Sequence, residues 1–119
     1  MCKRLLFAVA IAFVVATLSA CASDDPRQDA VVTGCVPGTD TDKPHATGQV
    51  RNTSSKTSSY FVRIEFHDPS GNRVSEGVDT ITDVEPGTSS PFTIIGLAHA
   101  KGPLTCDVGT VRRTAVPGS

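Results

Sequence analysis

Four cysteine thiols are the most reactive side chains of this sequence, and their spacing limits what they can do. A thiol can attack an electrophile, bind a metal, form a disulfide or accept a lipid. Redox and zinc sites usually pair two cysteines as Cys-x-x-Cys. No such pair occurs among Cys2, Cys21, Cys35 and Cys106. The spacing therefore argues against a redox or metal-thiolate site.

The other groups that could do chemistry also lack the spacing of a known site. Three histidines, His45, His67 and His99, lie on separate segments without a His-x-His or His-x₃-His pair. The sequence contains no Gly-x-Ser-x-Gly motif, no Gly-rich phosphate loop and no stripe of basic and aromatic residues. These motifs would indicate a hydrolase, a nucleotide site or a nucleic-acid surface. We therefore expect no catalytic residue, metal, cofactor or nucleic-acid partner, and predict that the protein is not an enzyme.

The N-terminal segment has the layout of an export signal. Lys3 and Arg4 precede an unbroken apolar run over residues 5–16, which is shorter than the ~20 residues that a membrane-spanning helix needs. The run leads into Leu18-Ser19-Ala20-Cys21. An ordinary cleaved signal peptide and an uncleaved N-terminal anchor are the alternatives at this point.

Leu18-Ser19-Ala20-Cys21 resembles the lipobox of bacterial lipoprotein signal peptides. The resemblance implies that residues 1–20 are a cleaved helical signal peptide and that Cys21 receives a diacylglycerol thioether and becomes the first mature residue. Residues 21–29 would then be the lipidated cysteine and a polar tether. Two or more acyl chains anchor a protein stably, so we expect a protein held on the extracytoplasmic face of a cell membrane.

The charge of the mature chain favours the lipid as the main membrane contact. Removal of Lys3 and Arg4 with the leader leaves 9 basic residues against 12 acidic ones, a net charge of −3. This charge argues against nucleic acid or anionic headgroups as partners.

The same resemblance leaves one cysteine pair for a disulfide. Cys2 would leave with the leader and Cys21 would carry lipid, so only Cys35 and Cys106 remain. An exported compartment permits their disulfide, and a mature domain of this size benefits from a covalent crosslink. We therefore predict a Cys35–Cys106 disulfide that joins the first strand to the last.

Short alternating runs separated by turn residues predict an all-β domain over residues 30–119. The clearest strand is Ser59–His67, which places Tyr60, Val62, Ile64 and Phe66 on one face. Other strands are expected at residues 30–36, 45–52, 72–78, 80–84, 90–97 and 104–112. A type I turn is expected at Asp68-Pro69-Ser70-Gly71 and a type II turn at Glu85-Pro86-Gly87-Thr88. This rhythm predicts a small immunoglobulin-like antiparallel β-sandwich of about seven strands. The Ser-rich segment Thr53–Ser59 is expected to be an exposed flexible loop.

The run GQVRNTSSKTSSYFVRIEFHDPSG over residues 48–71 resembles FxLYD-type domains, which are small β-sandwich modules on bacterial lipoproteins. The shared pattern is a strand ending in Val-x-Asn, a Ser-rich turn, an alternating apolar strand and an Asp before a Gly turn. The eponymous motif falls on Ile64-Glu65-Phe66-His67-Asp68, where only Asp68 matches by identity. The resemblance covers residues 46–95 and implies no catalytic residues.

These observations predict a membrane-anchored extracytoplasmic lipoprotein that acts as a non-enzymatic accessory or protein-interaction module, with an envelope protein as its possible partner. Its expected contact surface is the polar face of the sheet together with Thr53–Ser59. The alternative is a small-ligand or metal-binding carrier of the envelope.

Overall fold

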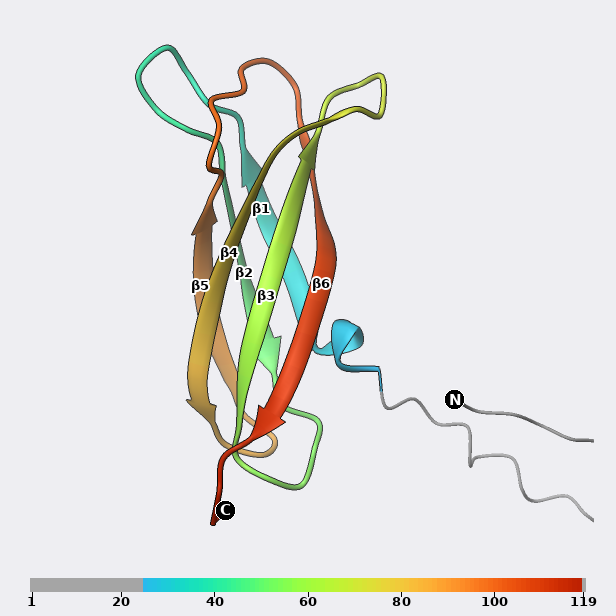
Figure 1. Cartoon of the computed structure of the whole chain (residues 1–119), viewed down its shortest axis with the longest axis vertical. Coiled ribbons are helices and arrows are strands. Elements are labelled where there is room, and N and C mark those ends of the chain that lie inside the picture. The colour runs from blue at the N-terminus through green and yellow to red at the C-terminus, as the bar shows by residue number, and fades with distance from the viewer. Residues whose placement is uncertain (1–24, 119) are drawn as a thin grey trace, which may run out of the picture.

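The computed structural model describes residues 25–118, and the leader and Cys21 lie outside this range. The described residues form a short 3₁₀ turn followed by six strands (Figure 1). These elements are η2 (Pro26–Asp29), β1 (Ala30–Val36), β2 (His45–Arg51), β3 (Ser58–His67), β4 (Arg73–Val84), β5 (Ser89–Ile95) and β6 (Thr105–Ala115).

The six strands form two antiparallel three-stranded sheets, ordered β1-β2-β5 and β4-β3-β6. Immunoglobulin sandwiches place strands A, B and E side by side in one sheet, and F, C and C′ in the other. Strands β1, β2 and β5 correspond to strands A, B and E, and strands β6, β3 and β4 correspond to strands F, C and C′. The expected small antiparallel β-sandwich is therefore confirmed, without counterparts of strands D and G among residues 25–118.

The expected count of seven strands is corrected to six, because residues 72–78 and 80–84 belong to one continuous strand, β4. Asp79 does not end this strand, since it pairs with Val62 of β3 while its side chain stays exposed. A shift of register follows near Asp83, which has a φ of 55°. An extra residue at this point allows both Ile81 and Val84 to face the core.

The core lies between the two sheets and depends on the alternation along β3. Tyr60, Val62, Ile64 and Phe66 are all 0% exposed, as the period-2 pattern predicts. Side chains of the other sheet pack against them, among them Ala46, Val50, Phe92 and Ile94. Burying each large apolar side chain contributes roughly 1.5–3 kcal/mol.

Both turns expected from the sequence are present, one between the paired strands β3 and β4 and one where the chain crosses from β4 to β5 in the other sheet. The amide of Gly71 donates to the carbonyl of Asp68 at 2.9 Å, and the amide of Thr88 donates to that of Glu85 at 3.1 Å. Gly87 has a φ of 77°, the positive value that the third residue of a type II turn requires.

The strand directions give the sandwich two poles (Figure 1). The N-terminal pole comprises η2, the loop of residues 52–57, the turn of residues 85–88 and the end of β6. The opposite pole comprises the connections over residues 37–44, 68–72 and 96–104. The chain therefore enters and leaves the domain at the same end.

Candidate functional sites

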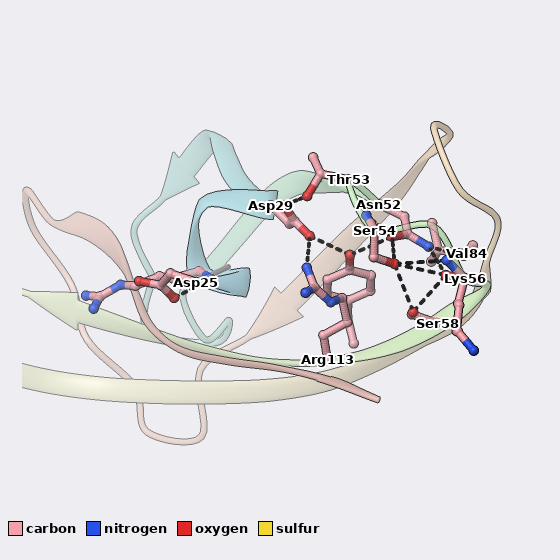
Figure 2. A network of polar contacts seen from close by, with 11 residues as sticks. Asp25, Asp29, Asn52, Thr53, Ser54, Lys56, Ser58, Val84 and Arg113 are labelled. Carbon is pink, nitrogen blue, oxygen red and sulfur yellow. Dashed lines mark hydrogen bonds and ion pairs between the residues drawn. The ribbon is translucent and has the colours of Figure 1, made fainter. Parts of the chain in front are cut away.

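A buried polar network occupies the N-terminal pole, and the turn η2 positions its central carboxylate (Figure 2). Asp25 caps the turn by accepting a bond from the amide of Arg27 at 2.9 Å, and Pro26 follows at the first helical position. The turn delivers Asp29 to a site where it is only 3% exposed. Asp29 was expected to belong to the polar tether of residues 21–29, but it is buried in the domain.

Three donors surround the Asp29 carboxylate. The hydroxyl of Tyr60 donates to Oδ2 at 2.5 Å, and the guanidinium of Arg113 donates to the same oxygen at 3.2 Å. The hydroxyl of Thr53 donates to Oδ1 at 2.7 Å. These contacts join η2, the 52–57 loop, β3 and β6. They also compensate the cost of placing a charged group in the interior.

The pKa values in this network reflect the balance between burial and hydrogen bonding. Burial raises the pKa of Asp29, but the bonds from Tyr60, Thr53 and Arg113 together outweigh this effect and lower it. Burial and the bond to Asp29 raise the pKa of Tyr60 to about 12. Both groups thus titrate far from neutral pH. A general acid or base works best with a pKa near the working pH, so these shifts favour a structural role for the pair.

Asn52 makes a second group of buried hydrogen bonds next to this network, and its side chain is 0% exposed. Its side-chain amide donates to the carbonyls of Lys56 at 2.8 Å and Val84 at 2.7 Å. Its Oδ1 accepts from the amide and the hydroxyl of Ser54 at 2.8 and 2.7 Å. Asn52 therefore ties the 52–57 loop to the end of β4.

The segment Thr53–Ser59 is more structured than the sequence suggested. Ser58 is only 2% exposed and its hydroxyl donates to the carbonyl of Lys56 at 2.9 Å. Thr53, Ser55 and Lys56 remain exposed. The expected exposure of this segment is therefore confirmed only for Thr53, Ser55 and Lys56. The Val-x-Asn pattern at residues 50–52 was the one sequence signal of the buried asparagine.

The outer face of the β4-β3-β6 sheet carries the charged residues that the alternation of β3 predicted. Arg63 contacts Glu65 at 2.8 Å and Glu76 at 3.1 Å. The two ring nitrogens of His67 lie 3.0 Å from Asp107 and 3.4 Å from Glu65. Further along the face, the guanidinium of Arg112 lies 5.4 Å from the ring centre of Phe61. Ion pairs on an exposed face each contribute about 0–1 kcal/mol.

The predicted disulfide is confirmed, because Cys35 and Cys106 are bonded. The bond connects β1 with β6 and thereby joins the two sheets at their shared side. Cys21, the predicted lipidation site, lies outside the described residues.

The three histidines are not brought together by the fold. His45 begins β2, His67 ends β3, and His99 lies in the connection between β5 and β6. Over residues 25–118, no three His, Cys, Asp or Glu side chains gather in a way that could hold a metal ion.

Among the surface depressions of residues 25–118, three are considered as ligand sites. One of about 490 Å³ lies beside the buried network and is lined by polar residues that include Gln28, Ser55 and Arg113. One of about 430 Å³ lies on the outer face of the β1-β2-β5 sheet, next to Val36, His45 and Ile95. One of about 270 Å³ lies near His99 and Lys101. None of the three penetrates the apolar core, since no residue of that core lines them.

The described range contains no helix of the length and apolarity needed to cross a bilayer. Compared with known proteins, the chain matches no family, no curated protein and no solved structure.

Proposed function

We propose that this protein is an extracytoplasmic lipoprotein, anchored to the cell membrane through lipid on Cys21, that acts as a non-enzymatic accessory or protein-interaction module. The observation that carries the proposal is the sequence Leu18-Ser19-Ala20-Cys21 behind a charged and then apolar leader. The resemblance of residues 48–71 to FxLYD-type domains, which occur on such lipoproteins, supports the proposal.

The disulfide supports an exported location. Disulfides persist in oxidising compartments and are rare in the cytosol. Cys35 and Cys106 are bonded, which fits a domain that folds after export.

The chemistry of the buried groups supports a non-enzymatic role. Every buried side-chain nitrogen or oxygen within residues 25–118 has a hydrogen-bond partner. A buried polar group without a partner is a frequent sign of a ligand or a reacting group. The polar groups of this domain instead stabilise the fold.

The anchor can be tested by cell fractionation. In a bacterial host with a lipoprotein-processing pathway, the wild-type protein should be found in the membrane fraction and resist extraction by salt. The variant Cys21→Ser should leave the membrane or accumulate as the unprocessed precursor. A wild-type protein that is released into the soluble fraction would contradict the proposal.

The interaction role can be tested by site-specific crosslinking in intact cells of the organism from which the protein comes. Thr80→Cys places a thiol on the outer face of the β4-β3-β6 sheet, because Thr80 pairs with outward-facing Phe61. Thr93→Cys places a matched thiol on the exposed outer face of the other sheet. We expect one discrete crosslinked protein from position 80 and none from position 93. Absence of a specific product at position 80 would count against the charged face as the contact surface.

A further inference from the structure

The chain between Cys21 and the folded domain is shorter than the sequence suggested. Its length limits the orientations that the domain can adopt relative to the membrane. The bonds to Asp29 hold η2 on the domain, and Arg27 adds a bond to the carbonyl of Val108 at 3.2 Å. The chain from Cys21 to Asp25 therefore spans at most about 14 Å. A tether that ended at Ala30 would have more than twice this reach.

The two poles are consequently at very different distances from the anchor. Strand β3 has 10 residues, which corresponds to about 33 Å from one pole to the other. A tether of about 14 Å that enters at the N-terminal pole keeps this pole near the bilayer surface. The connections of the opposite pole then point away from the bilayer.

Several basic side chains lie at the N-terminal pole. Arg27, Arg51, Lys56 and Arg112 are exposed, and none of them forms an ion pair within the described part of the chain. Arg113 lies beside them and is paired with Asp29.

The acidic side chains of this pole lie mainly on its other side. Asp83 and Glu85 belong to β4 and to its turn into β5, whereas η2 packs on β6 and β1. Sheet order puts β4 and β6 at opposite edges. Among residues 25–118, Asp25 is the one exposed acid on the side of the tether, and the sequence has a further acid, Asp24, within the tether. The N-terminal pole thus has a local excess of basic groups, although the mature chain as a whole carries a net negative charge.

We infer that the N-terminal pole, through Arg51, Lys56 and their basic neighbours, contacts anionic lipid headgroups of the membrane that holds the Cys21 lipid. This inference rests on the proposed function, since the contact requires the anchor. Headgroups within about 8 Å of a basic side chain are only weakly screened at physiological salt. Each such residue raises the population of the bound orientation by about fivefold.

The contact can be measured by placing a spin label at each pole of the processed full-length lipoprotein. Ser55→Cys labels the N-terminal pole and Ser70→Cys labels the opposite pole, and both positions are exposed. The anchored protein is reconstituted into vesicles of phosphatidylcholine with or without phosphatidylglycerol, and relaxation by a nickel-chelating lipid is recorded. We expect strong relaxation at position 55, greater with phosphatidylglycerol and weakened by added salt, and little at position 70.

Charge variants separate the effect of the headgroups from that of the tether. In vesicles with phosphatidylglycerol, Arg51→Gln/Lys56→Gln should lower the contact at position 55 severalfold, because two basic groups are lost. The matched variant Lys43→Gln/Lys101→Gln changes two exposed lysines of the opposite pole and should leave the contact unchanged. An unchanged contact in the first variant would refute the assignment to anionic headgroups.

Failure of the inference and failure of the proposed function give different results. A protein that carries no lipid on Cys21 does not stay with the vesicles, and the proposed function itself is then wrong. An anchored protein whose position 55 is no closer to the headgroups than position 70 overturns the inference alone.

Discussion

Replacing Tyr60 by Phe removes one buried hydroxyl and leaves the aromatic ring in the core. The hydroxyl lies 2.5 Å from Oδ2 of Asp29 and 3.2 Å from Oδ1 of Asn52. A hydrogen bond to a charged group contributes about 1.5–3 kcal/mol. The variant also leaves a carboxylate that is 3% exposed with one donor fewer. We therefore expect Tyr60→Phe to lower the free energy of unfolding by about 2 kcal/mol.

Urea unfolding with the disulfide intact measures this loss, and a matched hydroxyl deletion controls for the chemistry of the change. Thr82→Val removes an exposed hydroxyl of β4 and should change the free energy of unfolding by less than about 0.5 kcal/mol. In thermal unfolding, 2 kcal/mol corresponds to a decrease of roughly 8–16 °C in Tm for a domain of this size.

Alkaline pH gives an independent test of the same group. The pKa of Tyr60 is about 12 in the folded protein, against 10.0 for the unperturbed phenol. Because the folded-state pKa is the higher one, this contribution to stability is complete below pH 10 and is lost as the pH rises towards 12. Two pKa units correspond to about 2.7 kcal/mol.

Tyr60 is the only tyrosine and the protein has no tryptophan, so phenolate absorbance reports this group alone. The difference in stability between the wild type and Tyr60→Phe should shrink between pH 10 and 12. A phenol that titrates near pH 10 in the folded protein, or a variant as stable as the wild type, would refute the reasoning.

Three further predictions concern other parts of the fold. Removing the disulfide with Cys35→Ala/Cys106→Ala should cost roughly 4 kcal/mol, because the bond closes a loop with a sequence separation of 71, and chemical denaturation of both proteins measures the difference. Asn52→Ala should lower the free energy of unfolding by about 3 kcal/mol or more and raise the rate of amide hydrogen exchange in residues 53–57. The control variant Asn72→Ala, at an exposed position, should do neither. Equal effects of the two variants would contradict the central role of Asn52. The pKa of Asp29 is lowered in the folded protein, so its contribution to stability is present above the unfolded-state value of 3.8 and is lost as the pH falls through the lower folded-state pKa. Asp29→Asn should reduce the loss of stability at acid pH, seen as a flatter acid limb in a plot of unfolding free energy against pH. An acid limb of unchanged slope would contradict a stabilising role of the Asp29 carboxylate.

The elements that could be predicted from sequence are those governed by local patterns. The alternation at Tyr60–Phe66 identified the inner face of β3, and Asp68–Gly71 and Glu85–Thr88 identified two turns. Each pattern is contained within a few residues, so no knowledge of distant partners was required. The disulfide could be predicted because the lipobox resemblance assigned Cys2 to the leader and Cys21 to the lipid, which left Cys35 and Cys106 as the remaining pair.

The buried network could not be predicted in the same way, because its partners are far apart in the chain. Asp29 bonds with Tyr60 across 31 positions and with Arg113 across 84. A charged residue in a polar stretch is usually exposed, so its burial depends on contacts that no local pattern shows. The sequence Asp25-Pro26 is a helix-start signal and could have indicated that the domain begins before Ala30.

The continuous β4 strand was missed for a related reason. The two strands expected over residues 72–78 and 80–84 left out Asp79, a residue type that is disfavoured within strands. Because β4 is an edge strand and Asp79 is exposed there, the carboxylate remains solvated without interrupting the ladder.

We propose that Cys21 carries the lipid that holds this domain at the membrane. Mass spectrometry of the N-terminal peptide, taken from protein purified out of bacterial membranes, can detect this lipid. We expect a mature chain that begins at Cys21 and carries the mass of a diacylglycerol thioether. A chain that begins at another residue, or a Cys21 without lipid, would contradict it.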